Sequence, residues 1–261
     1  MSRLIDKLNR VSQTVPQPMG FMVAQPVSPK PKLLLIASLT QVNVDGLADY
    51  VAGADGGLSH IHQSSEAKAL QEVSQAISDI PWGVWLKDSG QPEIKQITKI
   101  GCDFMVFPAA KTSLAILQNE AVGRILEVEA SLSDGLLRAI NELPVDAVLI
   151  ASELREDYFL TWYHLVLFQH FTNLLTKPLL VSISSNVTAN ELQALWETGV
   201  DGVIVEVEAR QPAGRVSKLR QAIDKLTFPS QHKRGKAEAL LPRIGGEPST
   251  VTIEEEEEGE E

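Results

Sequence analysis

The sequence is poor in cysteine and in aromatic residues: it has one cysteine, Cys102, and Phe, Trp and Tyr make up 5% of its 261 residues. A single cysteine cannot form a disulfide within the chain, which is typical of proteins from reducing compartments, so the sequence predicts a cytoplasmic protein. Because no basic residue adjoins this cysteine to favour a thiolate, we interpret it as a small buried apolar residue.

Long hydrophobic runs are also missing. No apolar segment approaches the ~20 residues that cross a bilayer, and charges interrupt the first fifteen residues, where a signal peptide would have an apolar core. We therefore expect no contact with a membrane.

Positive charge is scarce as well. The 34 acidic residues outnumber the 23 basic ones, and the nearest approach to a basic cluster is the polar segment QHKRGK (231–236). A nucleic-acid interface needs a basic surface, so we expect no nucleic-acid partner. The Gly-rich P-loop and the G-x-G-x-x-G, G-x-S-x-G and C-x-x-C patterns are absent too. Their absence removes the marked signatures of nucleotide binding, nicotinamide binding, α/β-hydrolases and zinc ribbons.

The sequence does contain one phrase four times: small residues, an aspartate, and then an apolar run. The four aspartates are Asp55, Asp103, Asp146 and Asp201, with spacings of 48, 43 and 55 residues. A second kind of apolar run accompanies each copy, starting near Lys30, Ile80, Gly123 and Lys177. The chain therefore has eight strand-like runs, each followed by a segment long enough for a helix.

Short buried strands that alternate with helices predict an α/β protein with a parallel sheet, and eight such units close a (β/α)8 TIM barrel. An open, doubly wound sheet is the alternative. We expect the barrel to occupy residues 33–228, after an N-terminal helix and Pro-rich arm in residues 1–32. Residues 229–261 end in seven glutamates and have the composition of a disordered, solvating tail.

One predicted helix differs from the others. Residues 157–175 are apolar around most of the helix, whereas a helix that covers a barrel needs one apolar stripe. Either this helix lies under the N-terminal arm, or its aromatic residues form a homodimer interface. Those aromatic residues are Tyr158, Phe159, Trp162, Tyr163 and Phe168.

Carboxylates stand near the C-terminal ends of two predicted strands, where (β/α)8 enzymes carry out their chemistry. Alternate residues of a strand point to opposite faces, so packing of Leu126 and Val128 on the helices turns Glu127 and Glu129 into the barrel. The same argument turns Glu206 inward. We interpret these three glutamates as candidate acid–base residues or metal ligands.

Two lysines near the C-terminal ends of other strands are candidates for substrate binding. Lys87, which shares the inward face of its strand with Trp85, and Lys111 are suited to hold an anionic substrate group. The structural alternative is an internal network in which Lys87, Lys111 or Arg155 pairs with the glutamates.

Histidines and neutral polar groups complete the candidate set. His60 and His62 lie two residues apart at the end of the second strand and, with Glu208, could bind zinc, manganese or iron; an exposed loop pair is the alternative. Polar groups near strand ends are candidates for substrate binding. They are Ser38, Ser152, Ser182, Ser184 and Asn186.

Residues 177–207 carry a K-P strand start, a T-x-x-E-L helix start and a G-x-D-G-V strand start in order. In these features the segment resembles the closing unit of the phosphate-binding (β/α)8 barrels, such as the indole-glycerol-phosphate and thiamine-phosphate synthases. The resemblance covers about 30 of 261 residues and implies a barrel.

The same resemblance implies where glycine-rich phosphate-binding loops would stand. This sequence has Ser184-Ser185-Asn186 and Glu206-Val207-Glu208 at those positions. A carboxylate there would repel phosphate, so we expect neither a phosphorylated ligand nor FMN in that pocket.

Two hypotheses about function follow. The first is an enzyme of lyase or isomerase type that acts on a small metabolite by proton transfer or C–C bond chemistry, with a divalent metal as a candidate cofactor. The second is a barrel without catalysis that serves as a binding or assembly module.

Overall fold

The computed structural model describes residues 2–12, 32–39, 47–61, 74, 77, 79–86, 100–118, 121–150, 159–207 and 214–227. The predicted Pro-rich arm and the predicted disordered tail lie outside these residues. No helix in the described part of the chain is long and apolar enough to span a membrane.

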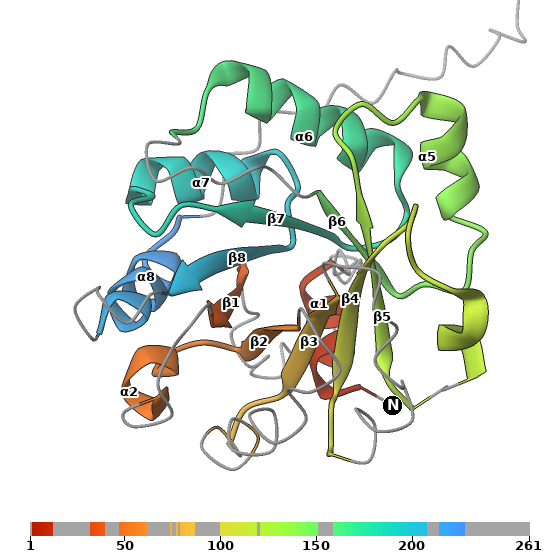
Figure 1. Cartoon of the computed structure of the whole chain (residues 1–261). Helices are drawn as coiled ribbons and strands as arrows, with labels where there is room; N and C mark the ends of the chain where they lie inside the picture. Colours follow the sequence, from red (N-terminus) through yellow and green to blue (C-terminus); the bar gives the residue numbers. More distant parts are fainter. Residues whose placement is uncertain are drawn as a thin grey trace, which may run out of the picture. The chain divides into compact units, whose positions relative to one another are not determined.

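Eight parallel strands close into a barrel in sequence order (Figure 1). They are β1 (Leu34–Leu39), β2 (Gly56–Ile61), β3 (Trp82–Leu86), β4 (Phe104–Pro108), β5 (Gly123–Val128), β6 (Ala147–Ile150), β7 (Leu179–Ile183) and β8 (Gly202–Val207). β1 pairs with β8 over six residues, from Leu34 opposite Gly202 to Leu39 opposite Val207. This closure confirms the predicted TIM barrel and excludes the open sheet.

Helices follow several of the strands along the chain and pack on the outside of the barrel. The described ones are α2 (Leu47–Val51), α5 (Asp134–Ile140), α6 (Trp162–Leu174), α7 (Ala189–Glu197) and α8 (Arg215–Asp224), with a 3-10 helix, η2, at Leu114–Gln118. At the start of α7, the Glu191 N–H donates to Thr188 Oγ1 and the Glu191 carboxylate accepts from the Thr188 N–H at 2.7 Å. This reciprocal pair is the capping box that the sequence predicts.

The repeated aspartates tie the N-terminal ends of neighbouring strands together. The Asp55 carboxylate accepts from the Leu35 N–H at 2.9 Å, while the Asp55 N–H donates to the Leu35 carbonyl at 2.7 Å. Asp146 forms the same two bonds with Arg124, and Asp201 forms them with Leu179. Each aspartate therefore satisfies backbone groups at the start of a strand pair, which explains why the phrase recurs.

Asp103 departs from this pattern. Its N–H still donates to the carbonyl of β3, at Trp82, but its carboxylate accepts from three groups of the N-terminal segment. The donors are Ser2 Oγ at 2.7 Å, the Arg3 N–H at 2.8 Å and the Leu4 N–H at 2.9 Å. These are the free donors at the start of helix α1 (Arg3–Ser12), so Asp103 caps that helix from another part of the chain.

Helix α1 fills the N-terminal end of the barrel (Figure 1). Its buried residues Leu4, Ile5 and Leu8 form one cluster with the inward-facing apolar residues of the strands. At Gly123 an added Cβ would lie 2.5 Å from Ile5 Cγ1, so the absence of a side chain lets the helix approach the sheet. The helix thus closes this end of the barrel with apolar side chains.

Side chains alternate along the strands as predicted. Ile125 and Ile204 belong to the inner cluster with α1, whereas Leu126, Val128 and Val205 belong to the outer cluster under the helices. Strand parity therefore correctly assigns Glu127 and Glu206 to the interior.

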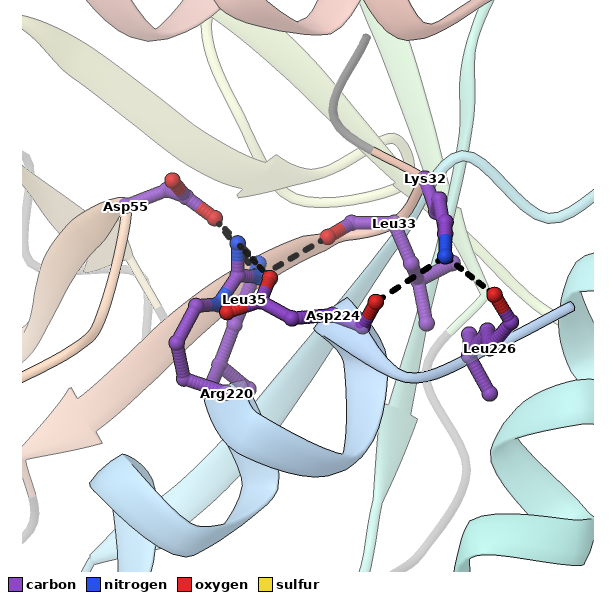
Figure 2. A network of polar contacts seen from close by, with 7 residues as sticks. All are labelled: Lys32, Leu33, Leu35, Asp55, Arg220, Asp224 and Leu226. Atoms are coloured by element: carbon purple, nitrogen blue, oxygen red, sulfur yellow. Dashed lines mark hydrogen bonds and ion pairs between the residues drawn. The ribbon is translucent and has the colours of Figure 1, made fainter. Parts of the chain in front are cut away.

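A polar network ties α8 to the first strand (Figure 2). Arg220 Nη2 lies 3.1 Å from Asp55 Oδ2 and donates to the Leu33 carbonyl at 3.0 Å. Lys32 Nζ donates to the carbonyls of Asp224 and Leu226 at the end of α8. These contacts join the last described helix to the residues that directly precede β1 and β2.

Helix α6 begins later than predicted. Thr161 precedes it, and its N–H donates to His164 Nδ1 at 3.0 Å, so the helix starts at Trp162. Burial lowers the pKa of His164, which keeps Nδ1 available as an acceptor. Phe168 is buried in the outer core, so its predicted place in an aromatic interface is wrong. Tyr158 lies outside the described residues.

Candidate functional site

The inward-facing side chains change character along the barrel axis. Five strands carry an apolar inward residue followed by a polar one at the C-terminal end. The polar residues are Ser38, His60, Glu127, Ser182 and Glu206. Ser38 and Ser182 are buried, and the other three are half-buried. Because the strands are parallel, all five lie toward the same mouth of the barrel.

Ser38 of β1 and His60 of β2 form a hydrogen-bonded pair. Ser38 Oγ lies 2.6 Å from His60 Nε2, and the imidazole stacks on the indole of Trp85 with ring centroids 5.0 Å apart. The hydrogen bond and the stacking together fix the plane of the ring. An imidazole held in this way is suited to proton transfer.

Glu127 of β5 is oriented by the same tryptophan. Trp85 Nε1 donates to Glu127 Oε2 at 2.6 Å, a short, charge-assisted hydrogen bond. Among the described residues this carboxylate has no lysine or arginine partner, and its Oε1 is left for a second interaction. Trp85 therefore contacts a carboxylate through its Nε1–H and an imidazole through its ring face, at the polar end of the interior.

A pocket opens beside Glu206, between β8 and the start of α8. It is a small, open depression with room for about one water molecule. Its lining residues are Tyr50, Ser185, Val205, Glu206, Val207, Gly214, Arg215 and Val216.

Arg215 is held in place at the edge of this pocket. Its Nε donates to the Ser185 carbonyl at 2.7 Å, and its Nη2 donates to Asn186 Oδ1. These bonds use one edge of the guanidinium, and Nη1 remains for an anionic group of a ligand.

The other predicted residues lie in different places. Glu129 follows the end of β5 in an exposed turn, where its carboxylate accepts from Ser131 Oγ at 3.3 Å. Lys111 is exposed in the turn after β4, and Ser184 and Asn186 follow β7. The structure thus places Glu127, Glu206 and His60 at the same end of the barrel interior, but it leaves Glu129 outside. Four predicted residues lie outside the described residues: Lys87, Ser152, His62 and Glu208. Arg155 of the alternative network lies outside them as well.

Metal binding by His60 stays a prediction, because its two proposed co-ligands are not described. Within the described ranges, no three His, Cys, Asp or Glu side chains are grouped as a metal ion requires. His60 itself is engaged with Ser38 and Trp85.

Cys102 plays no part in this site. It precedes β4 at the opposite end of the strand, and its thiol donates to the Phe104 carbonyl at 3.0 Å. Burial raises the pKa of the thiol to about 12, so the thiolate needed for nucleophilic attack is scarce at neutral pH.

Comparison with known proteins shows the fold. Neither a protein-family model nor a curated protein sequence matches the chain. Among solved structures, thiamine phosphate pyrophosphorylase from Pyrococcus furiosus matches with a TM-score of 0.59 and 14% identity, over 76% of this chain and 98% of that one. The tryptophan synthase A-subunit from the same organism matches with a TM-score of 0.57 and 12% identity, over 75% and 98%.

At this level of identity the likeness shows a (β/α)8 barrel, in agreement with the fold that residues 177–207 implied. The structure adds two residues that the sequence did not single out for the site. Tryptophan 85 was expected to point inward, but its bridge between His60 and Glu127 joins strands that are far apart in sequence. The signal in the sequence that could have pointed to Arg215 is Gly214, which precedes it at the start of the last described helix and has a φ of +87° in the structure.

Proposed function

We propose that the chain is an enzyme of lyase or isomerase type that moves a proton on a small metabolite at the C-terminal mouth of the barrel. The observation that supports the proposal is the change from apolar to polar inward residues along the axis. A barrel needs no carboxylate or imidazole there for packing, because branched apolar residues fill such layers well. Burying a carboxylate even in part costs free energy of folding, so such groups in a protein interior often belong to a functional site.

In this proposal Glu127 and Glu206 exchange protons with the substrate, and His60 acts as a third acid–base group. Ser38 positions the imidazole, and Trp85 positions both His60 and Glu127. A general base that is held within hydrogen-bond reach of the reacting proton contributes roughly 10²- to 10⁴-fold to the rate.

Arg215 would hold an anionic group of the substrate, such as a carboxylate, beside Glu206. Lys87 and Lys111 remain further candidates for this role. By the resemblance of residues 177–207 to phosphate-binding barrels, Glu206-Val207-Glu208 and Ser184-Ser185-Asn186 would take the place of the phosphate-binding glycines. The proposed substrate therefore carries no phosphate at that position, and FMN is not its cofactor.

Proton transfer can be tested without knowing the natural reaction. The full chain is incubated in D₂O with a panel of small carbonyl acids, and deuterium incorporation next to the carbonyl is followed by NMR. We expect catalysed exchange with at least one acid, and a loss of at least ~100-fold in Glu127→Gln or Glu206→Gln. Glu142→Gln, on the exposed surface after α5, is the matched control and should leave the rate unchanged.

The binding module remains the second candidate. Hydrogen bonds within the barrel favour it, since Glu127 and His60 already have partners in Trp85 and Ser38. Ligand binding without exchange of any carbon-bound proton would support the module and contradict the enzyme.

A further inference from the structure

Ser38 and His60 have the arrangement that nucleophilic catalysis by a serine requires. A reactive serine needs a base within hydrogen-bond reach and a third group that orients the base. Ser38 Oγ lies 2.6 Å from His60 Nε2, and the imidazole stacks on the indole of Trp85 with an angle of 30° between the ring planes. The hydroxyl, the base and the orienting group thus come from three neighbouring strands, β1, β2 and β3.

Trp85 also favours the charged form that such a base passes through. A cation over the face of an indole, within ~6 Å of the ring centroid, is attracted by the ring electrons. The two ring centroids are 5.0 Å apart, and the indole N–H donates to the Glu127 carboxylate at 2.6 Å, which polarises the ring further. Trp85 therefore orients His60 and stabilises the imidazolium that forms when the serine loses its proton.

Packing of the barrel does not require this polar pair. On the same inward face, the residue two positions earlier in each strand is apolar: Ile36 in β1 and Leu58 in β2. Continuing that pattern would fill the next layer without a polar group. Burial of a hydroxyl and an imidazole costs free energy of desolvation, which one hydrogen bond between them offsets in part. The pair is therefore better explained by chemistry than by stability.

The position of Ser38 limits what can react with it. Ser38 is in register with Glu206 of β8, and Glu206 lines the open depression at the start of α8. Ser38 itself is 2% exposed, so its hydroxyl is accessible to small groups at most. We therefore expect it to react with short acyl groups and to exclude long ones.

We propose that Ser38 is a nucleophile that takes up a small acyl group from an ester, with His60 as its base. The Ser38 oxygen forms a bond to the acyl carbon while His60 Nε2 accepts the hydroxyl proton. The bond from the acyl carbon to the alcohol oxygen of the ester then breaks, and that oxygen takes the proton from the imidazolium. Water next adds to the acyl carbon with His60 again as the base, the carboxylic acid leaves, and the Ser38 hydroxyl is restored.

Acyl transfer goes beyond the proton transfer proposed above. Proton transfer to or from carbon uses Ser38 only to position the imidazole, whereas acyl transfer forms a covalent bond to Ser38. The first reaction is detected as deuterium on carbon and the second as an adduct on one serine. Either activity can therefore be absent while the other is present.

Mass spectrometry of the full chain treated with diisopropyl fluorophosphate tests the proposal. We expect a stable adduct on the peptide that contains Ser38. Ser38→Ala should remove the adduct, and His60→Gln should slow its formation at least ~100-fold. Ser133→Ala is the matched control and should leave the rate unchanged, because Ser133 is exposed before α5 and its side chain makes no capping hydrogen bond.

Hydrolysis of p-nitrophenyl esters provides a second measurement. The parent chain should release p-nitrophenol faster from the acetate than from the octanoate, and Ser38→Ala should abolish the difference. Ser38→Cys keeps a nucleophile beside the same base and should still be acetylated at residue 38, which a serine with a purely structural role would not explain.

Thermal melts check that each variant folds. The proposal is overturned if neither probe modifies the parent chain, if the adduct lies on another residue, or if the parent and His60→Gln react at equal rates. Ester hydrolysis that Ser38→Ala leaves unchanged overturns it as well.

Discussion

Replacing Asp103 by alanine should loosen helix α1 without disrupting the rest of the barrel. The carboxylate accepts from Ser2 Oγ, the Arg3 N–H and the Leu4 N–H, at 2.7 to 2.9 Å. Loss of an ordinary N-cap costs about 0.5–2 kcal/mol, and one hydrogen bond to a charged group contributes about 1.5–3 kcal/mol. Because the three bonds share one carboxylate, we expect a combined cost of about 2–4 kcal/mol.

The helix should nevertheless stay docked in most molecules. Leu4, Ile5 and Leu8 are buried, and each such side chain contributes about 1.5–3 kcal/mol by leaving water. Burial of the three exceeds the loss of the cap, so the substitution lowers the free energy of local opening rather than expelling the helix. A loss of 2–4 kcal/mol corresponds to exchange of the α1 amides that is roughly thirty- to several-hundredfold faster.

Hydrogen exchange read by mass spectrometry on peptides covering residues 2–12 measures this effect directly. Asp146→Ala is the control, because Asp146 begins a strand with the same phrase but its carboxylate accepts from the Arg124 N–H. The control should lose about 1–2 kcal/mol in urea unfolding and leave exchange in α1 unchanged. Equal exchange in α1 for the two variants would refute the role assigned to Asp103.

Two further predictions follow from perturbed titrating groups. The pKa of His164 is lowered by burial, so its contribution to stability is present above the unfolded value of 6.5 and is lost as the pH falls. The variant His164→Gln keeps an acceptor for the Thr161 N–H and should therefore show a smaller drop in melting temperature between pH 7.5 and 5.5 than the parent. The pKa of Cys102 is raised to about 12, so the native thiol should react with a disulfide reagent near pH 8 far more slowly than the thiol of the unfolded chain. For the same reason, the stability advantage of the parent chain over Cys102→Ala should decline as the pH rises from about 9 toward 12. Fast labelling of the native thiol, or identical pH profiles for variant and parent, would contradict them.

The repeated aspartates show how far the sequence predicts this fold. Four copies of one phrase predict eight strands and a closed barrel, because each copy marks a strand pair and the chemistry of a strand start is local. Asp103 has the same sequence signal as the other three, yet its carboxylate caps α1. That difference depends on a helix 100 residues away and leaves no mark in the neighbourhood of Asp103.

The candidate site divides in the same way. The alternation of side chains correctly places Glu127 and Glu206 inside, since it depends on the period of a single strand. The alternation cannot be applied to Glu129, because β5 ends at Val128 and Glu129 lies beyond the strand. The contacts between Ser38 and His60, and between Trp85 and Glu127, join different strands, and their lengths depend on barrel closure rather than on either segment alone.

The two ends of the barrel interior depend on each other. The polar residues at the C-terminal ends of five strands contribute little hydrophobic stabilisation. A barrel whose N-terminal end was also open would need other contacts to make up for the missing burial. Helix α1 supplies three buried apolar side chains at that N-terminal end, and Gly123 leaves room for them. This arrangement places the apolar part of the barrel interior toward the N-terminal ends of the strands, so carboxylates and an imidazole can occupy the other end without the loss of the fold. We therefore expect substitutions in α1 to affect stability more than ligand binding, and substitutions at Glu127 or Glu206 to do the reverse.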